Sequence, residues 1–266
     1  MSTQPTSYYV RIGKNRFQPT SHTGGAWRTT EQHMAPAAGL LINELMRYEP
    51  REDMHYSRFA FEILGTIHFD EVEIKVETLR PGRTIELVQA EMFVQGRVCI
   101  RLSAWRLMTG DSTPVAVIHD ETMRPIDECV EGNQLQDWNG GWIASLTTRH
   151  DPDLVRKPGR YKLWMTYPYD LVEGEKTDPM VKILSMADTA NGVAPAMDPS
   201  SSGFGFPNID MQLHLYRQPT GSWLGVDATV NVGTEGVGLT SAVLSDENGP
   251  FGRSEQILTI RQVPGV

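Results

Sequence analysis

The chain has 266 residues, of which 39% are hydrophobic and 21% are charged. This composition is ordinary for a globular protein and excludes bulk disorder, and the length fits one large domain or two small ones. The net charge of −9 argues against nonspecific nucleic-acid binding, because no basic stripe is present to displace phosphate counterions. It does not exclude an anionic small ligand, for which Arg217, Arg253 and Arg261 are candidates, although solvated surface arginines are the commoner case.

The N-terminal residues 1–17 contain no apolar segment of the kind found in signal peptides. The longest apolar stretch, around Met34 to Ile42, is too short to span a bilayer. Cys99 and Cys129 are far apart in the sequence, so reduced thiols are expected rather than a disulfide framework. These features predict a cytoplasmic protein without a membrane span.

The first predicted helix covers His33 to Arg47, where apolar residues recur at helical spacing. Its beginning is rich in alanine and it contains Gly39. A glycine inside a helix costs about 1 kcal/mol relative to alanine, so we expect close packing against a sheet to compensate. We interpret His33 as a helix-start residue rather than as a catalyst.

Strands are expected after this helix. Residues 71–77 and 98–105 alternate between apolar and polar side chains, which is typical of half-buried antiparallel strands. A stretch rich in Pro, Gly and Asp follows, with one short expected strand at 115–118. We therefore predict an N-terminal unit at 1–125, a linker or crossover at 126–158, and a C-terminal unit at 159–266.

The second predicted helix runs from Asp178 to Gly192. Asp178 is a favourable N-cap, Pro179 a favourable first helical residue, and Asn191-Gly192 a stop signal. Asp188 falls near the C-terminal end, where the helix dipole disfavours a negative charge. An acid at such a position is a mild indication of function.

Alternating strands follow the second helix as well, at 209–216 and 224–230. The two halves therefore repeat one order of elements, a helix and then several antiparallel strands, although the sequence identity between them is low. This is an α+β arrangement. A helix lined with small residues and wrapped by a curved sheet describes the hotdog unit, so the pattern predicts a double hotdog.

Several familiar catalytic motifs are missing from the sequence. Gly252-Arg-Ser254-Glu-Gln256 is not a G-x-S-x-G elbow, and the histidines show no metal-ligand spacing. The glycines of 233–238 sit between strands and lack the lysine and helix of a phosphate loop, so a turn is the better interpretation.

An ordered set of short motifs nevertheless resembles a known family. The set comprises Phe17-x-Pro19-Thr20-x-x-Thr23-x-x-x-Trp27, Gln32-His33, Leu171-Val-Glu-Gly-Glu175, Ala187-Asp188-x-x-Asn191-Gly192, Pro207-Asn208-x-Asp210 and Gly252-Arg253-Ser254-x-Gln256. In order and spacing it resembles the TesB-like acyl-CoA thioesterases, the acyl-CoA thioesterase II group with its actinobacterial relatives. The resemblance covers nearly the whole chain.

The resemblance implies the double-hotdog fold and hydrolysis of acyl-CoA to free acid and CoA. It also implies a site in which Asp188, Asn208 and Gln256 orient a water molecule, with Asn208 standing where the best-studied branch has threonine. A thioester is already electrophilic, so no covalent nucleophile, metal or cofactor is required. Because relatives commonly associate, a homo-oligomer is expected, in a role in lipid metabolism.

Each of these residues also has a purely structural interpretation. Asp188 would be an exposed helix-end acid, Asn208 the opening residue of a strand, and Gln256 a buried amide in a structural hydrogen bond. Asp210 is an alternative acid. The first half has no obvious acid corresponding to Asp188, so the duplication predicts one site per chain, with chemistry from the second unit and mainly wall and support from the first.

Two other functions remain in competition at this point. The departures at Met34-Ala35 and at Asn208 would suit a non-catalytic acyl-CoA or acyl-carrier binding protein. A hotdog hydratase or dehydratase pairs an Asp with a His. No histidine is near Asp188 in the sequence, so a partner such as His214 would have to be brought to Asp188 by the fold.

Overall fold

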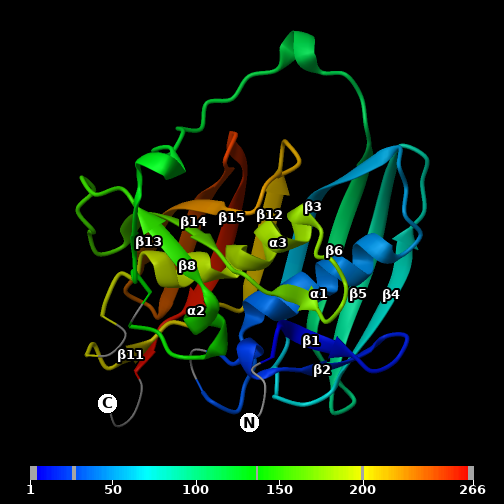
Figure 1. The fold of residues 1–266 in the computed structure, drawn as a ribbon, viewed down its shortest axis with the longest axis horizontal. Helices are drawn as coiled ribbons and strands as arrows, with labels where there is room; N and C mark the ends of the chain where they lie inside the picture. Colours follow the sequence, from blue (N-terminus) through cyan, green and yellow to red (C-terminus); the bar gives the residue numbers. More distant parts are fainter. Residues whose placement is uncertain (1–4, 26–27, 136, 199–200, 263–266) are drawn as a thin grey trace.

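The computed structural model describes residues 5–25, 28–135, 137–198 and 201–262, so Trp27 of the N-terminal motif lies outside the described residues. The first half forms one long helix and a run of strands, as expected (Figure 1). A 3-10 turn, η1 (Ser21–Thr23), comes before the helix α1 (Met34–Arg47). The strands are β1 (Ser7–Arg11), β2 (Arg16–Pro19), β3 (Met54–Ile63), β4 (Val72–Arg80), β5 (Ile85–Val94) and β6 (Arg97–Met108).

The stretch between β6 and residue 160, which includes the predicted crossover 126–158, carries short elements of its own. They are η2 (Thr113–Val115), η3 (Ile126–Glu128), β7 (Val130–Gly132), α2 (Gly141–Ser145) and β8 (Thr147–His150). The prediction of a strand at 115–118 is wrong, because this segment is the end of η2 followed by a loop that arches away from the body (Figure 1). Val115 is 78% exposed. A run of β-branched residues forms a strand only where a neighbouring strand can pair with it.

The second half repeats the plan with a divided helix. Its consecutive parts are α3 (Pro179–Ser185), η4 (Met186–Thr189) and α4 (Ala190–Val193). Asp178 caps α3 as expected, since its side chain accepts the N–H of Met180 at 2.8 Å. The strands are β9 (Arg160–Thr166), β10 (Asp170–Val172), β11 (Phe204–Gly205), β12 (Asp210–Leu215), β13 (Leu224–Val232), β14 (Val237–Asp246), β15 (Gly249–Thr259) and β16 (Arg261–Gln262).

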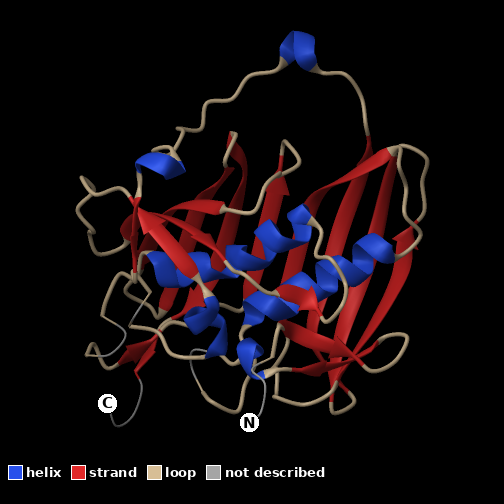
Figure 2. Ribbon diagram, in the orientation of Figure 1, coloured by secondary structure: helices blue, strands red, loops and turns tan. Residues whose placement is uncertain are grey.

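One continuous sheet joins the two units. Within the described residues it has 14 strands in the order β10-β1-β2-β4-β5-β6-β3-β12-β15-β14-β13-β9-β8-β7, and β11 pairs separately with β16. The units meet in the antiparallel pair β3–β12, where Phe61 lies opposite Met211, and again in the parallel pair β1–β10. The sheet curves around the helices (Figure 2). The predicted α+β double hotdog is therefore confirmed.

The two inner helices pack directly against each other. A Cβ atom added to Gly39 of α1 would lie 2.7 Å from the Cβ of Ser185 in α3, closer than real Cβ contacts allow. The expectation that Gly39 faces a sheet is therefore wrong, because the small side of α1 accommodates the second helix. This packing places the beginning of α1 beside η4.

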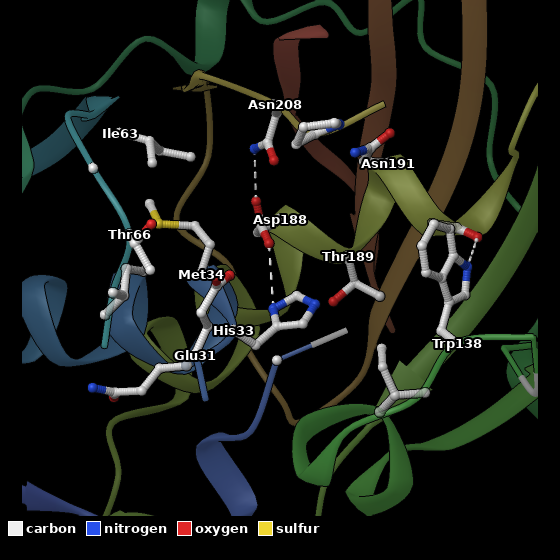
Figure 3. Close-up of a pocket in the computed structure, with 17 residues that line it drawn as sticks. Glu31, His33, Met34, Ile63, Thr66, Trp138, Asp188, Thr189, Asn191 and Asn208 are labelled. Carbon is white, nitrogen blue, oxygen red and sulfur yellow. Dashed lines mark hydrogen bonds and ion pairs between the residues drawn. The ribbon is translucent and has the colours of Figure 1, made fainter. Parts of the chain in front are cut away.

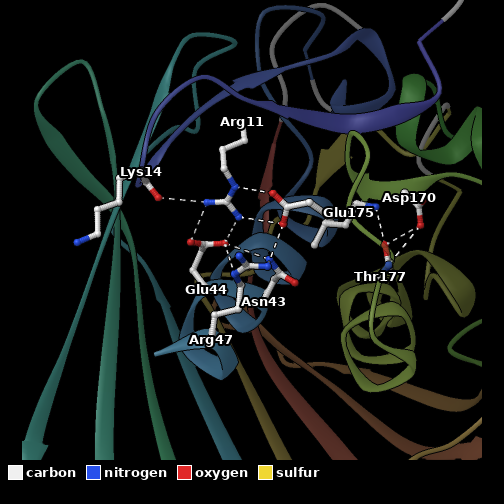
Figure 4. A network of polar contacts seen from close by, with 9 residues as sticks. Arg11, Lys14, Asn43, Glu44, Arg47, Asp170, Glu175 and Thr177 are labelled. Carbon is white, nitrogen blue, oxygen red and sulfur yellow. Dashed lines mark hydrogen bonds and ion pairs between the residues drawn. The ribbon is translucent and has the colours of Figure 1, made fainter. Parts of the chain in front are cut away.

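A charged network fixes the other end of the helix pair (Figure 4). Arg11 of β1 contacts Glu44 of α1 at 2.7 Å and Glu175 of the second unit at 2.5 Å. Arg47 also contacts Glu175, at 3.1 Å. The hydrogen bond from Arg11 lowers the pKa of Glu175 below its ordinary value. Carboxylates of both units thus share one guanidinium.

The inner surfaces of helices and sheet form one hydrophobic core that spans both units. Cys99 and Cys129 are buried free thiols. Among the residues that the structure describes, no helix is long and apolar enough to cross a membrane.

Candidate active site

Asp188 is a buried carboxyl group in the divided second helix. It lies in η4, and only 5% of the residue is exposed. Its Oδ1 accepts a hydrogen bond from Nδ2 of Asn208 at 2.9 Å (Figure 3). Burial raises the pKa of Asp188 to about 6, and the hydrogen bond from Asn208 opposes part of that increase. The carboxyl therefore titrates close to neutrality, as acid–base groups at functional sites often do.

The other two predicted site residues hold Asp188 from different sides. Asn208 precedes β12 and donates a second hydrogen bond, to the carbonyl oxygen of Asp210 at 3.2 Å. Gln256 is fully buried on β15, where its Nε2 donates to the main-chain carbonyl oxygen of Asp188 at 3.3 Å. The structure thus brings all three residues together, but Gln256 contacts the backbone of Asp188 rather than its carboxyl group.

His33 of the first unit approaches the same carboxyl group. Its Nδ1 lies 3.4 Å from Oδ2 of Asp188 and also accepts the N–H of Ala35 at 3.0 Å, which makes His33 the N-cap of α1. Burial lowers the pKa of His33 to about 3, so the ring is neutral. Because Nδ1 acts as an acceptor, the ring proton is on Nε2. Only a protonated Asp188 can share a proton with Nδ1.

A cavity of about 260 Å³ is lined by His33, Asp188 and Asn208, whereas Gln256 does not line it. Its wall combines residues of the first unit, such as His33, Met34 and Ile63, with Asp188 and Asn208 of the second unit. The crossover contributes Trp138 and Ile143. Figure 3 shows Asp188 in the middle, with Ile63 and Thr66 on one side and Trp138 on the other. The cavity is thus built at the junction of both units and the crossover.

Other residues singled out from the sequence lie elsewhere. Arg217 binds Asp246 through two hydrogen bonds, at 2.7 and 2.8 Å, and Arg253 contacts Asp120. Neither arginine lines the cavity. The alternative acid, Asp210, accepts the N–H of Ile257 at 2.7 Å and is also absent from the cavity wall.

Two residues of the candidate site, His33 and Trp138, are not predicted to be functional from the sequence. His33 occupies the helix start as expected, and its contact with Asp188 is an addition that only the structure shows. His214, considered as a partner for Asp188, lies exposed on β12 opposite Arg58 and Arg253. Trp138 was placed in a linker, and no local pattern marked it as a cavity residue. Two signals in the sequence mark His33, namely its position directly before the small-residue helix and its place in the Gln32-His33 motif.

Metal ligation finds no support in this site. Across the described parts of the chain, no group of three or more His, Cys, Asp or Glu side chains is placed to hold a metal ion.

Comparison with protein families matches both halves of the chain. The acyl-CoA thioesterase N-terminal domain matches residues 23–107, and the acyl-CoA thioesterase C-terminal domain matches residues 126–260. The chain belongs to the acyl-CoA thioesterase family. The match to the second domain begins at residue 126, so it includes the crossover residues that line the cavity. Among curated proteins, none matches the sequence.

Solved structures of similar proteins show the fold of this family member. A proposed thioesterase II of Thermobifida fusca is 17% identical, covers 97% of this chain and 96% of its own, and gives a TM-score of 0.70. The acyl-CoA thioesterase II TesB2 of Mycobacterium marinum is 14% identical, with 97% and 96% covered and a TM-score of 0.67. A hotdog-fold protein of unknown function from Alicyclobacillus acidocaldarius is 11% identical, with 96% and 97% covered and a TM-score of 0.72.

Proposed function

We propose that this protein hydrolyses acyl-CoA thioesters to free acid and CoA, using a water molecule oriented by Asp188, Asn208 and Gln256. Family membership supports the reaction class. The observation that carries the proposal is the buried carboxyl group of Asp188 in the cavity wall, fixed by Asn208 at 2.9 Å. A carboxyl group held in this way suits general base catalysis, which contributes about 10² to 10⁴ in rate.

In the proposed reaction, ionised Asp188 takes a proton from water while the water oxygen bonds to the thioester carbonyl carbon. The carbonyl electron pair moves to its oxygen. When the tetrahedral intermediate collapses, that pair re-forms the carbonyl, the C–S bond breaks, and the sulfur leaves with the bonding electrons. The proton held by Asp188 passes to the sulfur, which releases CoA as a thiol and leaves Asp188 ionised for the next turnover.

Asn208 and Gln256 have different parts in this proposal. Asn208 uses its amide hydrogens on Asp188 and Asp210, so its carbonyl oxygen is the group left to accept a hydrogen bond from the water. Gln256 fixes the main-chain carbonyl of Asp188 and thereby the direction of its side chain. We therefore regard Gln256 as a positioning residue, and the contribution of both amides as mainly orientation.

The first unit supplies groups suited to the developing negative charge. The start of α1 forms part of the cavity wall through His33 and Met34. A helix N-terminus favours an anion, and a neutral imidazole with its proton on Nε2 is a hydrogen-bond donor. We propose that the oxyanion of the tetrahedral intermediate forms on this side of the cavity.

The thioesterase proposal is tested by thiol release from a panel of acyl-CoA substrates. We expect wild-type protein to release thiol and Asp188→Asn to be slower by at least about 100-fold. Asp227→Asn is the matched control, because it makes the same change at an acid of β13 that pairs with Lys162 at 2.8 Å and does not line the cavity, and it should retain activity. Equal rates for wild type and Asp188→Asn would rule out the mechanism, and tight acyl-CoA binding without any turnover would favour a non-catalytic binding protein.

One observation favours a second candidate function. Hydration of an enoyl thioester uses an Asp and a His, and His33 Nδ1 lies 3.4 Å from Asp188 Oδ2. The same cavity would then hold an enoyl-CoA instead of a saturated acyl-CoA. Loss of enoyl absorbance on addition of the protein, without thiol release, would support hydration in place of hydrolysis.

For the setting of the activity, we propose a cytoplasmic homo-oligomer with a role in lipid metabolism. The two buried free thiols suit a reducing compartment. Sedimentation equilibrium over a range of concentrations measures the oligomeric state, and a mass equal to one chain at all concentrations would contradict this part of the proposal.

A further inference from the structure

The crossover segment divides two neighbouring cavities. Trp138 and Ile143 line the cavity that contains Asp188 and also line a second, more polar cavity of about 640 Å³. Asn133, Asn139 and Thr148 are among the polar residues of the second cavity. The two apolar side chains therefore form a partition between a reaction chamber and a larger polar space.

Trp138 is held in this partition from several directions. Its indole Nε1 donates to the carbonyl oxygen of Gly192 in α4 at 3.2 Å. Its ring meets Phe206 edge-on, with centroids 5.6 Å apart and an interplanar angle of 81°. A Cβ atom at position 192 would lie 3.1 Å from the indole Nε1, so glycine at this position permits the close approach.

The neighbouring part of the crossover is anchored to the first unit. A Cβ atom on Gly141 would lie 1.9 Å from the carbonyl oxygen of Ser21, and the N–H of Trp142 donates to Gly24 at 3.2 Å. Gly140 adopts a φ of +111°, a conformation that few other residues tolerate. Ile143 is the residue after Trp142 in α2, so the backbone contacts of Gly141 and Trp142 leave the Ile143 side of the partition little freedom to move.

The exposure of the wall indicates how a thioester is oriented. Gly65 and Thr66 line the cavity and are exposed to solvent. Thr66 lies on the side opposite Trp138 (Figure 3). Ile143 is buried and Trp138 is half-buried, so this side of the wall is less exposed than Gly65 and Thr66. A bulky, charged carrier fits the solvent side, which leaves the apolar acyl group to extend past Asp188 toward Trp138. At about 260 Å³ the chamber lies just below the range of about 300–1,000 Å³ that is usual for ligand pockets.

We propose that Trp138 is a specificity-determining residue that ends the acyl chamber and limits the protein to short and medium acyl chains. The proposal rests on the thioesterase function above. In a hydrophobic pocket a single methylene that fits badly changes kcat/KM by roughly tenfold or more. Removal of the indole joins the chamber to the second cavity, so longer chains gain space.

The test compares acyl chain lengths in wild type, Trp138→Phe and Trp138→Ala. Calorimetry with non-hydrolysable S-alkyl-CoA thioethers measures affinity, and thiol release from the matching thioesters measures turnover. We expect the length of highest affinity to move to longer chains in Trp138→Ala, with roughly tenfold tighter binding of chains just beyond the wild-type optimum. Trp138→Phe should fall between the two. Trp105→Ala is the matched control, because Trp105 is half-buried on β6 beside Arg80 and does not line the cavity.

The outcomes separate this proposal from the proposed function. An unchanged length profile in Trp138→Ala overturns the role of Trp138 even if thiol release is intact. An equal loss of affinity at all lengths overturns it too, since it would place the CoA arm, rather than the acyl chain, against the indole. A shifted thioether profile without any thiol release supports Trp138 as the end of the chamber and contradicts thioester hydrolysis.

Discussion

The Nδ1 atom of His33 lies 3.4 Å from Oδ2 of Asp188, so the first and second hotdog units meet at one buried carboxyl group. His33 is the residue before α1, and Asp188 lies in η4 of the divided second helix. The close packing of α1 on α3, permitted by Gly39, brings these two points together. The first unit therefore contributes a polar group to the candidate site in addition to wall and support.

Activity should rise with pH as Asp188 becomes ionised. Its pKa is raised to about 6 by burial, and only the carboxylate can take a proton from water. The value of kcat/KM is expected to fall tenfold per pH unit below about pH 6 and to level off above it. Initial rates of thiol release between pH 4.5 and 8 measure this curve. A profile that stays flat through pH 6 would mean that another group acts as the base.

Asp188 should also lower the stability of the folded protein above pH 6. The ordinary pKa of 3.8 applies to the unfolded chain, so the folded state binds this proton more tightly, and the free energy of unfolding falls as the pH rises from about 3.8 to about 6 and stays lower above pH 6. The difference between 3.8 and about 6 corresponds to about 3 kcal/mol. Asp188→Asn keeps the acceptor for Asn208, so its free energy of unfolding should exceed that of wild type by up to this amount at pH 8.

The stability difference should disappear near pH 4, where Asp188 is protonated in the folded protein. Urea unfolding at both pH values makes this comparison within one pair of proteins. A difference of equal size at pH 4 and pH 8 would show that the amide acts through packing or hydrogen bonding and not through the charge.

His33→Asn separates the two parts that His33 plays. Asparagine is a favourable N-cap, so it replaces the hydrogen bond to Ala35 and should keep the free energy of unfolding within about 0.5 kcal/mol, whereas alanine should lose about 1 kcal/mol. Asparagine lacks the imidazole beside Asp188, and loss of an oxyanion donor costs about 10² or more in kcat. We therefore expect His33→Asn to be stable and slow. Full activity in this variant would restrict His33 to capping.

Much of the fold follows from local sequence patterns. Alternation at 71–77 and 98–105 predicts strands that the structure contains, and Asp178-Pro179 marks the start of α3. These features succeed because periodicity, capping and turn chemistry act over a few residues. The prediction of a strand at 115–118 is wrong because strand formation also depends on a neighbouring strand to pair with, and a short stretch of sequence does not reveal that neighbour.

The candidate site was less accessible to sequence reasoning. Asp188 stood out as an acid near a helix end, but its contact with His33 depends on how two distant helices pack. Trp138 reaches the cavity from a crossover that carries no periodic pattern. The 3-10 turn at η4 was also unforeseen, because the sequence reads as one continuous helix up to Asn191 and Gly192. Long-range packing decides each of these features.

Gly39→Ala is expected to destabilise the protein although alanine is the better helix former. Helix propensity alone would stabilise the variant by about 1 kcal/mol. The new Cβ, however, would lie 2.7 Å from the Cβ of Ser185, and overpacking of a core costs about 1 to 3 kcal/mol. The second effect is larger, so the urea midpoint of Gly39→Ala should fall. Ser185→Gly removes the opposing Cβ but also the hydrogen bonds of the Ser185 hydroxyl to Tyr167 and to the carbonyl oxygen of Lys182, so the contact is isolated by a double-mutant cycle: Gly39→Ala should cost less in the Ser185→Gly background than in wild type. If the double variant is no more stable than the sum of the single changes predicts, the strain does not come from this contact.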